Sequence, residues 1–359
     1  MAENVSVMDP LYQSYCLPLD GVLQHKYVLR GKSLGMAALP LQWVRGQHFG
    51  KTCDPSLFEH SCGLARLALG ICAKNQIQTL DFVVAAFLRG IGQTAFAYLG
   101  EQRLMGYNAG ERAAQLVMED SLAALVRKAG ANPVAVAAIM RGREPYGPLL
   151  MGESSIETLD SALRFAMRYG IVQTHVYRTL EIAKAFKRTP RGWVVEAAVL
   201  PQLERYKFVM QHNWQVACGT RFLGRAALLR RALDAYQAQT GALVKLLSGT
   251  DLAAAENLRR TPVAAAYIKM LDEDAPLYHV GDVPAPGVNP SALRKRVAAQ
   301  VHLPEDCILA EGPCHARAGA LTLTLSNGQQ FHAAPVVPAV LRVYATLKPR
   351  VNPEPRAWL

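Results

Sequence analysis

The chain has 359 residues, of which 51% are hydrophobic and 19% are charged, and its formal net charge is +11. This composition is typical of a globular protein with a sizeable core and excludes an intrinsically disordered chain. The excess of basic residues favours anionic partners such as nucleotides, nucleic acid or acidic proteins, unless it only forms a solvated surface without a specific partner.

Targeting and redox features favour a cytoplasmic protein without a membrane partner. The first segment, MAENVSVMDPLYQSY, is polar and acidic, unlike a secretory signal. No apolar run reaches the roughly 18 residues that cross a bilayer. Seven scattered cysteines without a Cys-x-x-Cys pair suit a reducing compartment better than a disulfide framework or a zinc knuckle.

The predicted elements begin with a small hairpin and a first helix, because residues 1–50 mix short apolar runs with Gly and Pro. From residue 57 to about residue 271, apolar residues recur at helical spacing, so the main body should be all-α. One helix should begin at Asn132-Pro133 and stop at Gly142.

Two segments interrupt the helical pattern. Pro190 and Gly192 bound a turn between basic residues, and a proline-rich linker lies near residues 280–290. Before that linker, Thr250 or Asp251 is a natural N-cap.

Beyond the linker a short helix is followed by LTLTL-SNG-QQFHAA, which predicts two strands joined by an Asn-Gly turn. AVLRVYATL predicts another strand or a short helix. The whole pattern predicts a mainly α protein. An N-terminal segment (1–50) should pack on a helical body (51–280), and residues 290–359 should form a small C-terminal α+β lobe.

The strongest pattern is an ordered series of segments between Asp9 and about Tyr278. It includes SLFEHSCGLARLA, AAFLRGIGQTAFAYLGE, GERAAQLVMED and IETLDSALRFAMRYGI. In order and spacing these segments resemble the HD-domain superfamily, in particular the deoxynucleoside triphosphate triphosphohydrolases. The resemblance implies an HD-type helical bundle that assembles as a dimer or larger oligomer.

The resemblance also implies where a metal would be bound. Family members hold a divalent metal with two His and two Asp, and the metal activates water and neutralises phosphate charge. This chain keeps the first His as His60, but Arg89-Gly90 stand in place of the His-Asp pair, and the last Asp falls at Glu157 or at Asp160. Arg and Gly offer no metal ligand. We therefore expect no metal cofactor and a degenerate, pseudo-HD protein that has lost the phosphohydrolase activity.

Residues that assist the metal in the family are replaced too. Gln93 and Tyr98 stand where assisting histidines are expected, and Gly110 precedes a retained Glu111. We interpret Arg89, Gln93 and Tyr98 as candidates to bind a ligand in the remodelled pocket.

Two alternatives remain open for Arg89. Its guanidinium could fill the metal's place and pair with Glu157 or Asp160 beside His60, or it could extend to solvent while the site collapses. His60 is either a hydrogen-bonded core residue or, with Glu111 or Glu157, a general acid–base pair.

The sequence leaves three hypotheses for the function. The first is a binding, regulatory or assembly subunit, as a homo-oligomer or with an active relative. The second is a metal-free lyase, isomerase or cyclase on an anionic small molecule or nucleotide oriented by Arg89. The third is a residual phosphohydrolase. Nucleic-acid binding is unsupported, because no aromatic series is interleaved with the basic segments. An open polar pocket lined by Arg89 and His60 would favour an enzyme.

Overall fold

The computed structural model describes residues 5–9, 13–17, 19–44, 54–78, 80–143, 145–152, 154–171, 176–284, 288–311, 320–334 and 340–346. Within these ranges no single helix has the length and hydropathy of a membrane span. The helices Asp120–Lys128 and Pro133–Met140 reach such values only as a pair, by length and composition, and they are bent by 106°.

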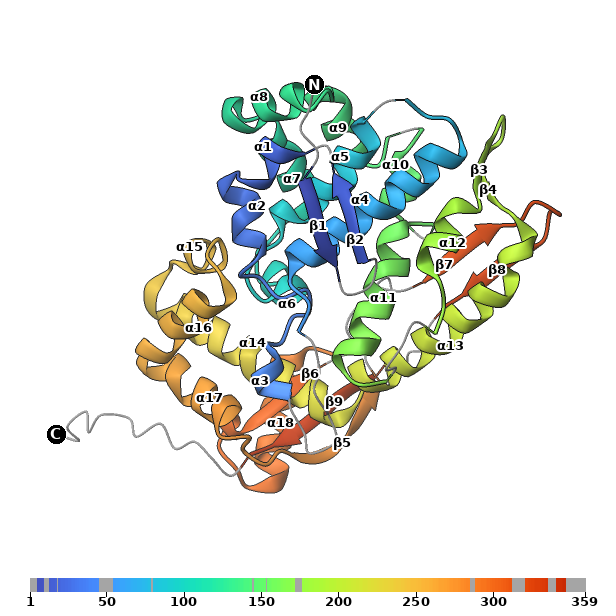
Figure 1. The fold of residues 1–359 in the computed structure, drawn as a ribbon. Coiled ribbons are helices and arrows are strands. Elements are labelled where there is room, and N and C mark those ends of the chain that lie inside the picture. Colours follow the sequence, from blue (N-terminus) through green and yellow to red (C-terminus); the bar gives the residue numbers. More distant parts are fainter. Residues whose placement is uncertain are drawn as a thin grey trace.

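Helices dominate the chain and small sheets lie at its edges (Figure 1). The first half contains β1 (Val5–Asp9), β2 (Gln13–Leu17), α1 (Asp20–Leu23), α2 (Lys26–Gly31), α3 (Leu41–Val44), α4 (Leu57–Lys74), α5 (Asp81–Leu88), the 3-10 helix η1 (Arg89–Gly92), α6 (Ala97–Glu101), α7 (Ala109–Val117), α8 (Asp120–Lys128), α9 (Pro133–Met140), α10 (Gly147–Leu150) and α11 (Ile156–Arg168). The second half contains α12 (Thr179–Lys184), β3 (Phe186–Thr189), β4 (Gly192–Val195), η2 (Ala197–Val199), α13 (Leu200–Ala217), α14 (Thr220–Thr240), α15 (Leu243–Leu247), α16 (Asp251–Arg260), α17 (Pro262–Asp272), β5 (Tyr278–Pro284), α18 (Pro290–Val301), η3 (Glu305–Cys307), β6 (Ile308–Glu311), β7 (Leu321–Thr324), β8 (Gln330–Ala333) and β9 (Val340–Ala345). The predicted mainly α fold is confirmed.

The central helix of the main body is α4, which packs against α5, α11 and α12. A capping box fixes its start: Ser56 Oγ accepts from the backbone N–H of Glu59, and the Glu59 carboxylate accepts from the backbone N–H of Ser56. The helix is buried over most of its length, so its side chains point into the largest apolar core. This placement carries His60, at the end of the first turn of α4, into the interior.

A second apolar core forms around α14, which packs on α17 and contacts α3, α15 and α16. In this core α16 begins at a predicted N-cap: Thr250 Oγ1 accepts a hydrogen bond from the backbone N–H of Ala253. In the main body, α9 begins at Pro133 after the N-cap Asn132 and ends before Gly142, whose φ is +80°. These local predictions are confirmed.

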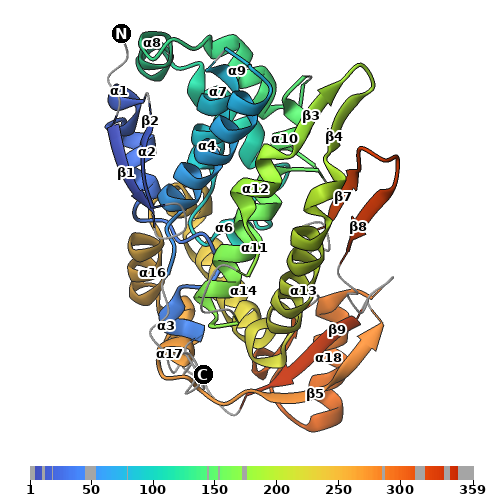
Figure 2. The ribbon, with the colours of Figure 1, turned by 45° about the vertical axis from the view of Figure 1, so that its right-hand side comes forward.

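The C-terminal strands form two separate sheets (Figure 2). Strands β5, β9 and β6 form one sheet in that order, and α18 packs on β6. The hairpin β7–β8, confirmed with its Asn-Gly turn, lies against β4 instead, with a bridge between Val195 and Leu325. Its inward residues Leu321 and Leu323 are part of the main core, because alternation along β7 gives that strand an apolar face.

Two further hairpins lie in the described chain. β1 pairs with β2 as the N-terminal pattern predicts. β3 pairs with β4 where only a turn was predicted, and Gly192, with φ +115°, forms that turn. β5 (Tyr278–Pro284) likewise occupies the first part of the predicted linker at 280–290.

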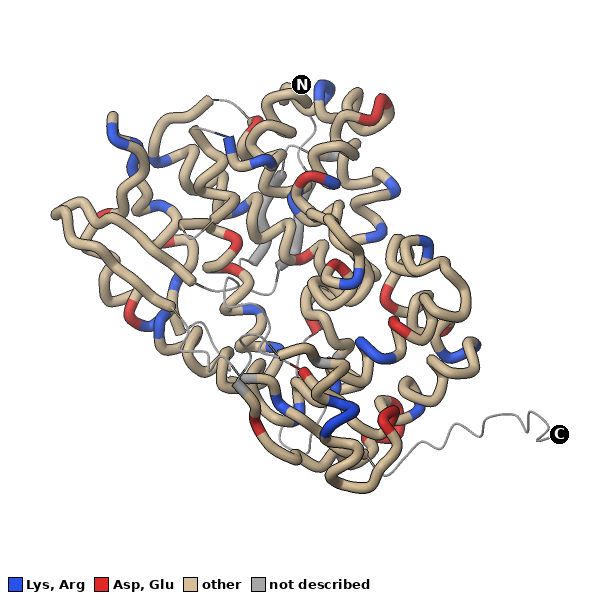
Figure 3. Tube along the Cα trace, turned by 180° about the vertical axis from the view of Figure 1, so that it is seen from behind, with Lys and Arg blue, Asp and Glu red and all other residues tan. Residues whose placement is uncertain are grey.

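Basic residues are scattered over the face shown in Figure 3, with acidic residues among them. They do not gather into one stripe along a helix on that face. The net charge of +11 is therefore not concentrated on that face in a way that would indicate a nucleic-acid-binding groove.

Candidate functional site

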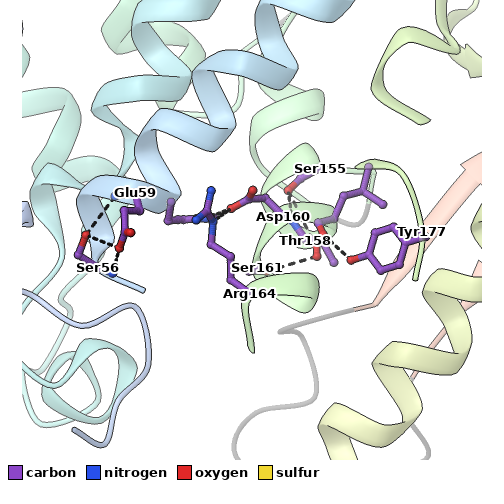
Figure 4. A network of polar contacts seen from close by, with 10 residues as sticks. Ser56, Glu59, Ser155, Thr158, Asp160, Ser161, Arg164 and Tyr177 are labelled. Atoms are coloured by element: carbon purple, nitrogen blue, oxygen red, sulfur yellow. Dashed lines mark hydrogen bonds and ion pairs between the residues drawn. The ribbon is translucent and has the colours of Figure 1, made fainter. Parts of the chain in front are cut away.

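A buried polar network joins α4 to α11. Nδ1 of His60 is 2.6 Å from Oδ2 of Asp160. The same carboxylate oxygen accepts a hydrogen bond of 2.7 Å from Nε of Arg164, one turn further along α11. Figure 4 shows Asp160 and Arg164 extending from α11 toward α4. His60, Asp160 and Arg164 are 5%, 0% and 3% exposed, so the network is interior.

The neighbours of Asp160 keep its carboxyl ionised. Burial by itself raises the pKa of this group, but the charge of Arg164 and the hydrogen bond from His60 outweigh burial, and the pKa falls from 3.8 to about 2. Because an ionised carboxylate only accepts hydrogen bonds, Nδ1 of His60 must donate. The contact with Arg164 therefore compensates the buried charge of Asp160.

Arg89 lies at the start of η1 and faces a different acid. Its Nε is 3.5 Å from Oε2 of Glu157, an ion pair without a hydrogen bond at that nitrogen. Burial raises the pKa of the neighbouring Glu101, and the charge of Arg89 acts against this rise. Gly110 borders the guanidinium: a Cβ at this position would lie 3.4 Å from Nη1 of Arg89, an ordinary van der Waals distance.

The two acids proposed as partners of Arg89 are therefore separated. Glu157 pairs with Arg89, whereas Asp160 is the acid beside His60 and takes Arg164 as its cation. Of the two candidates for the family's last Asp, Asp160 is the one that reaches His60.

Leu57 fills the space beside Gly90. A Cβ at residue 90 would lie 2.8 Å from Cδ1 of Leu57 and 3.2 Å from Oγ of Ser61, distances at which the neighbours would have to move. Leu57 is itself buried. A side chain at residue 90 would therefore require the buried Leu57 side chain to shift.

Tyr98 lines a pocket next to the network. This pocket has a volume of about 190 Å³ and is mostly apolar, with Ser161 and Phe165 of α11 on one side and Asn213 of α13 on another. Asn213 is 8% exposed; its Nδ2 donates to the carbonyl of Ala162, and its Oδ1 has no hydrogen-bond partner in the described chain. Neither His60 nor Arg89 lines this pocket.

The other two candidates lie apart from the network. Glu111 forms a two-pronged ion pair with Arg141, with both N–O distances 2.8 Å. The hydrogen bond from Arg141 lowers the pKa of Glu111, which faces solvent rather than His60. The backbone carbonyl of Gln93 accepts a hydrogen bond from Nη2 of Arg30.

Comparisons with known proteins bear on the fold. No protein-family model matches the sequence, and no curated protein is similar to it in sequence. Among solved structures, a phosphohydrolase from Bacteroides thetaiotaomicron VPI-5482 aligns over 96% of this chain and 100% of its own, with a TM-score of 0.66 and 12% identity. A hypothetical protein from Aquifex aeolicus aligns over 96% of this chain and 97% of its own, with a TM-score of 0.67 and 13% identity. This chain has a phosphohydrolase-like fold.

Within the phosphohydrolase-like fold, the described residues do not fit the metal that the HD resemblance implies. No group of three or more His, Cys, Asp or Glu side chains converges in the part of the chain that the structure describes. Of the expected ligand positions, His60 and Asp160 carry donors, and Oδ2 of Asp160 already accepts from Arg164. Leu57 stands in the space beside Gly90. One imidazole and one engaged carboxylate are too few ligands for a tight divalent site.

Several residues in and around the candidate site were not predicted from the sequence. Arg164 follows Asp160 at i,i+4 spacing, a signal that could have identified it. Leu57 and Asn213 gave no such signal, because packing alone decides their roles. Asp251, considered only as a cap, joins two loops: its Oδ2 accepts from Gly35 N and its Oδ1 from Phe96 N.

Proposed function

We propose that this protein is a degenerate HD-type relative of the phosphohydrolases, in which a buried guanidinium replaces the catalytic metal, and that it acts as a binding or regulatory subunit. The observation that carries the proposal is the bond between Arg164 and Asp160 beside His60. A cation is needed there because a buried carboxylate without one is costly. Arg164 supplies that cation from the protein itself.

Three substitutions support a loss of metal chemistry together. Arg89 provides donors where a ligand would need a lone pair. Gly90 provides no side chain, and Leu57 occupies the adjacent space. Because these changes fit one another sterically, a single reversion would not restore a metal site.

A binding role is supported by the pocket at Tyr98. Its apolar walls suit a small ligand, and the wall includes Asn213, whose buried Oδ1 has no hydrogen-bond partner in the described chain. Such a ligand would combine an apolar body with an N–H or O–H group. Assembly with a second copy or with an active relative is part of the same proposal, since a non-catalytic subunit acts through what it binds.

A metal-free enzyme is the second candidate, favoured by the short His60–Asp160 contact. A histidine held by a carboxylate can transfer protons near neutral pH. The near-complete burial of His60 and its absence from the lining of the Tyr98 pocket weigh against this role.

The test is metal content and phosphohydrolase activity of protein purified without chelator. We expect less than about a tenth of an equivalent of manganese, iron, nickel or zinc, and no release of triphosphate or phosphate from deoxynucleoside triphosphates after metal addition. The variant Asp160→Asn serves as the control for any trace activity. Near-stoichiometric metal together with hydrolysis that Asp160→Asn abolishes would refute the proposal.

A further inference from the structure

A second pocket lies beside η1, and no residue of the His60 network lines it. Its volume is about 270 Å³, and α2, η1, the loop before α7, α7 itself and α15 surround it. Figure 1 shows α2 and α15 near each other at this side of the molecule. In the described chain its charged lining residues are two arginines, Arg30 and Arg112, and no acidic side chain lines it.

Arg30 is fixed in the pocket by neutral groups. Its Nε donates to the carbonyl of Gly249 at 3.0 Å and its Nη2 to the carbonyl of Gln93 at 2.9 Å. No ion pair or hydrogen bond engages its Nη1 among the residues that the structure describes. Asp251 acts on Arg30 only from a distance, because its two oxygens are bound to the N–H groups of Gly35 and Phe96. A half-buried guanidinium is thus held in one orientation without a bonded anion.

Arg112 approaches the same space from α7. Its Nη1 donates a long hydrogen bond of 3.5 Å to Oε1 of Gln115, and the described chain gives this guanidinium no bonded anion. Tyr107 lines the same pocket and donates its hydroxyl hydrogen to the carbonyl of Gly92. Burial and the charge of Glu101 raise the pKa of Tyr107, whereas the charges of Arg30 and Arg112 lower it, as expected if both cations lie near this hydroxyl.

The remaining walls are of two kinds. Leu104, Leu116 and Leu247 provide apolar surface, while the hydroxyls of Thr94 and Ser248 donate to backbone carbonyls and keep acceptor capacity only. The donors that face the pocket without a bonded anion therefore come from the arginines. A site with two guanidinium groups and an apolar wall suits an anion that carries an apolar portion.

We propose that this pocket binds a small phosphate-bearing molecule, with the phosphoryl oxygens accepting hydrogen bonds from Arg30 and Arg112 and the remainder packing on the leucines. Guanidinium groups arriving from two walls match a dianion with several acceptor oxygens better than a single carboxylate. The volume of about 270 Å³ lies at the lower limit of ordinary ligand pockets, so the ligand is smaller than a nucleoside triphosphate. This site is independent of the function proposed for the His60 network.

Val244 offers a sharp test, because it lines the pocket and is 69% exposed, so polar side chains there do not disturb the core. The probe is phenyl phosphate, which has a dianionic head and an apolar ring, titrated by calorimetry. The variant Val244→Glu places a like charge at the pocket, and we expect it to weaken binding about tenfold, whereas its neutral isostere Val244→Gln should stay within about twofold.

A second pair of variants tests the cation. Arg112→Gln should also weaken phenyl phosphate binding about tenfold, whereas Arg127→Gln, which removes the same charge from exposed surface of α8, should not. Circular dichroism of each variant checks the fold. The proposal is overturned if phenyl phosphate fails to bind the unaltered protein at about 10 mM, or if Val244→Glu and Arg112→Gln bind it as tightly as their controls.

Discussion

Leu57 and Gly90 are complementary in shape: a Cβ at residue 90 would lie 2.8 Å from Cδ1 of Leu57. The leucine on α4 and the bare backbone of η1 thus close the space where the HD resemblance places a metal-binding carboxylate. The shape of the remodelled site therefore depends on the packing of Leu57 against Gly90.

Gly90→Ala should therefore destabilise the protein by about 1–3 kcal/mol, because the added methyl group overpacks the contact with Leu57. In a Leu57→Ala background the same change should cost little, since the shortened side chain makes room. Urea unfolding of the four proteins gives the coupling energy. Additive costs would show that Leu57 is not the obstacle.

Asp160→Asn should cost about 3–5 kcal/mol, because Arg164 then remains buried without its counter-ion. Replacing both members, as Asp160→Asn with Arg164→Met, should cost less than the single change. Chemical denaturation measures both free energies of unfolding. If the double variant is the less stable one, the ion pair is not what compensates the buried charge.

Because of Asp160, the free energy of unfolding should also depend on pH in the acid range. The pKa of Asp160 falls from 3.8 to about 2 in the folded state, so its stabilising contribution is full above 3.8 and is lost as pH falls toward 2. A shift of this size corresponds to about 2 kcal/mol. The difference in unfolding free energy between the unaltered protein and Asp160→Asn should be constant at pH 5–7 and shrink below pH 4. A difference that stays flat to the acid limit of folding would contradict the lowered pKa.

Asp251 should have the opposite dependence. Burial raises its pKa from 3.8 to about 6, although it accepts hydrogen bonds from the N–H groups of Gly35 and Phe96. A carboxyl whose folded pKa is raised favours the folded state most at low pH, and this contribution is lost as pH rises through about 6. Relative to Asp251→Asn, the unaltered protein should lose stability between pH 4 and pH 6.5. Thermal denaturation across this range measures the slope, and a relative gain in stability would refute the prediction.

Local signals in the sequence were sufficient for much of the fold. The cap at Asn132, the cap at Thr250 and the Asn-Gly hairpin of β7–β8 depend on neighbouring residues, and each was predicted correctly. The β3–β4 hairpin was missed because its strands are short and were noticed only through their turn. Where β7–β8 docks depends on a distant apolar surface, which no local pattern encodes.

In the candidate site, too, local features could be predicted from the sequence and features that depend on distant packing could not. His60 was identified from its segment, but whether Asp160 or Glu157 would face it depended on the rotation of α11 about its axis. From the sequence we considered Arg89 as the cation that takes the metal's place, whereas the arginine that pairs with Asp160 is Arg164. Burial distinguishes the two arginines, and burial is a property of the assembled helices. The pocket between Arg30 and Arg112 was likewise beyond reach, because it joins helices that are separate in sequence.

The docking of β7–β8 against β4 has a consequence for synthesis. The main core begins with Leu19 and Val22 and is completed by Phe331 and Ala333. On the ribosome, the apolar surface that receives this hairpin must therefore wait, uncovered, until almost the entire chain has been made. The N-terminal helices can collapse early, but they cannot reach their final packing as a nascent unit. Newly made chains should accordingly depend on chaperones that shield this edge until the last strands arrive.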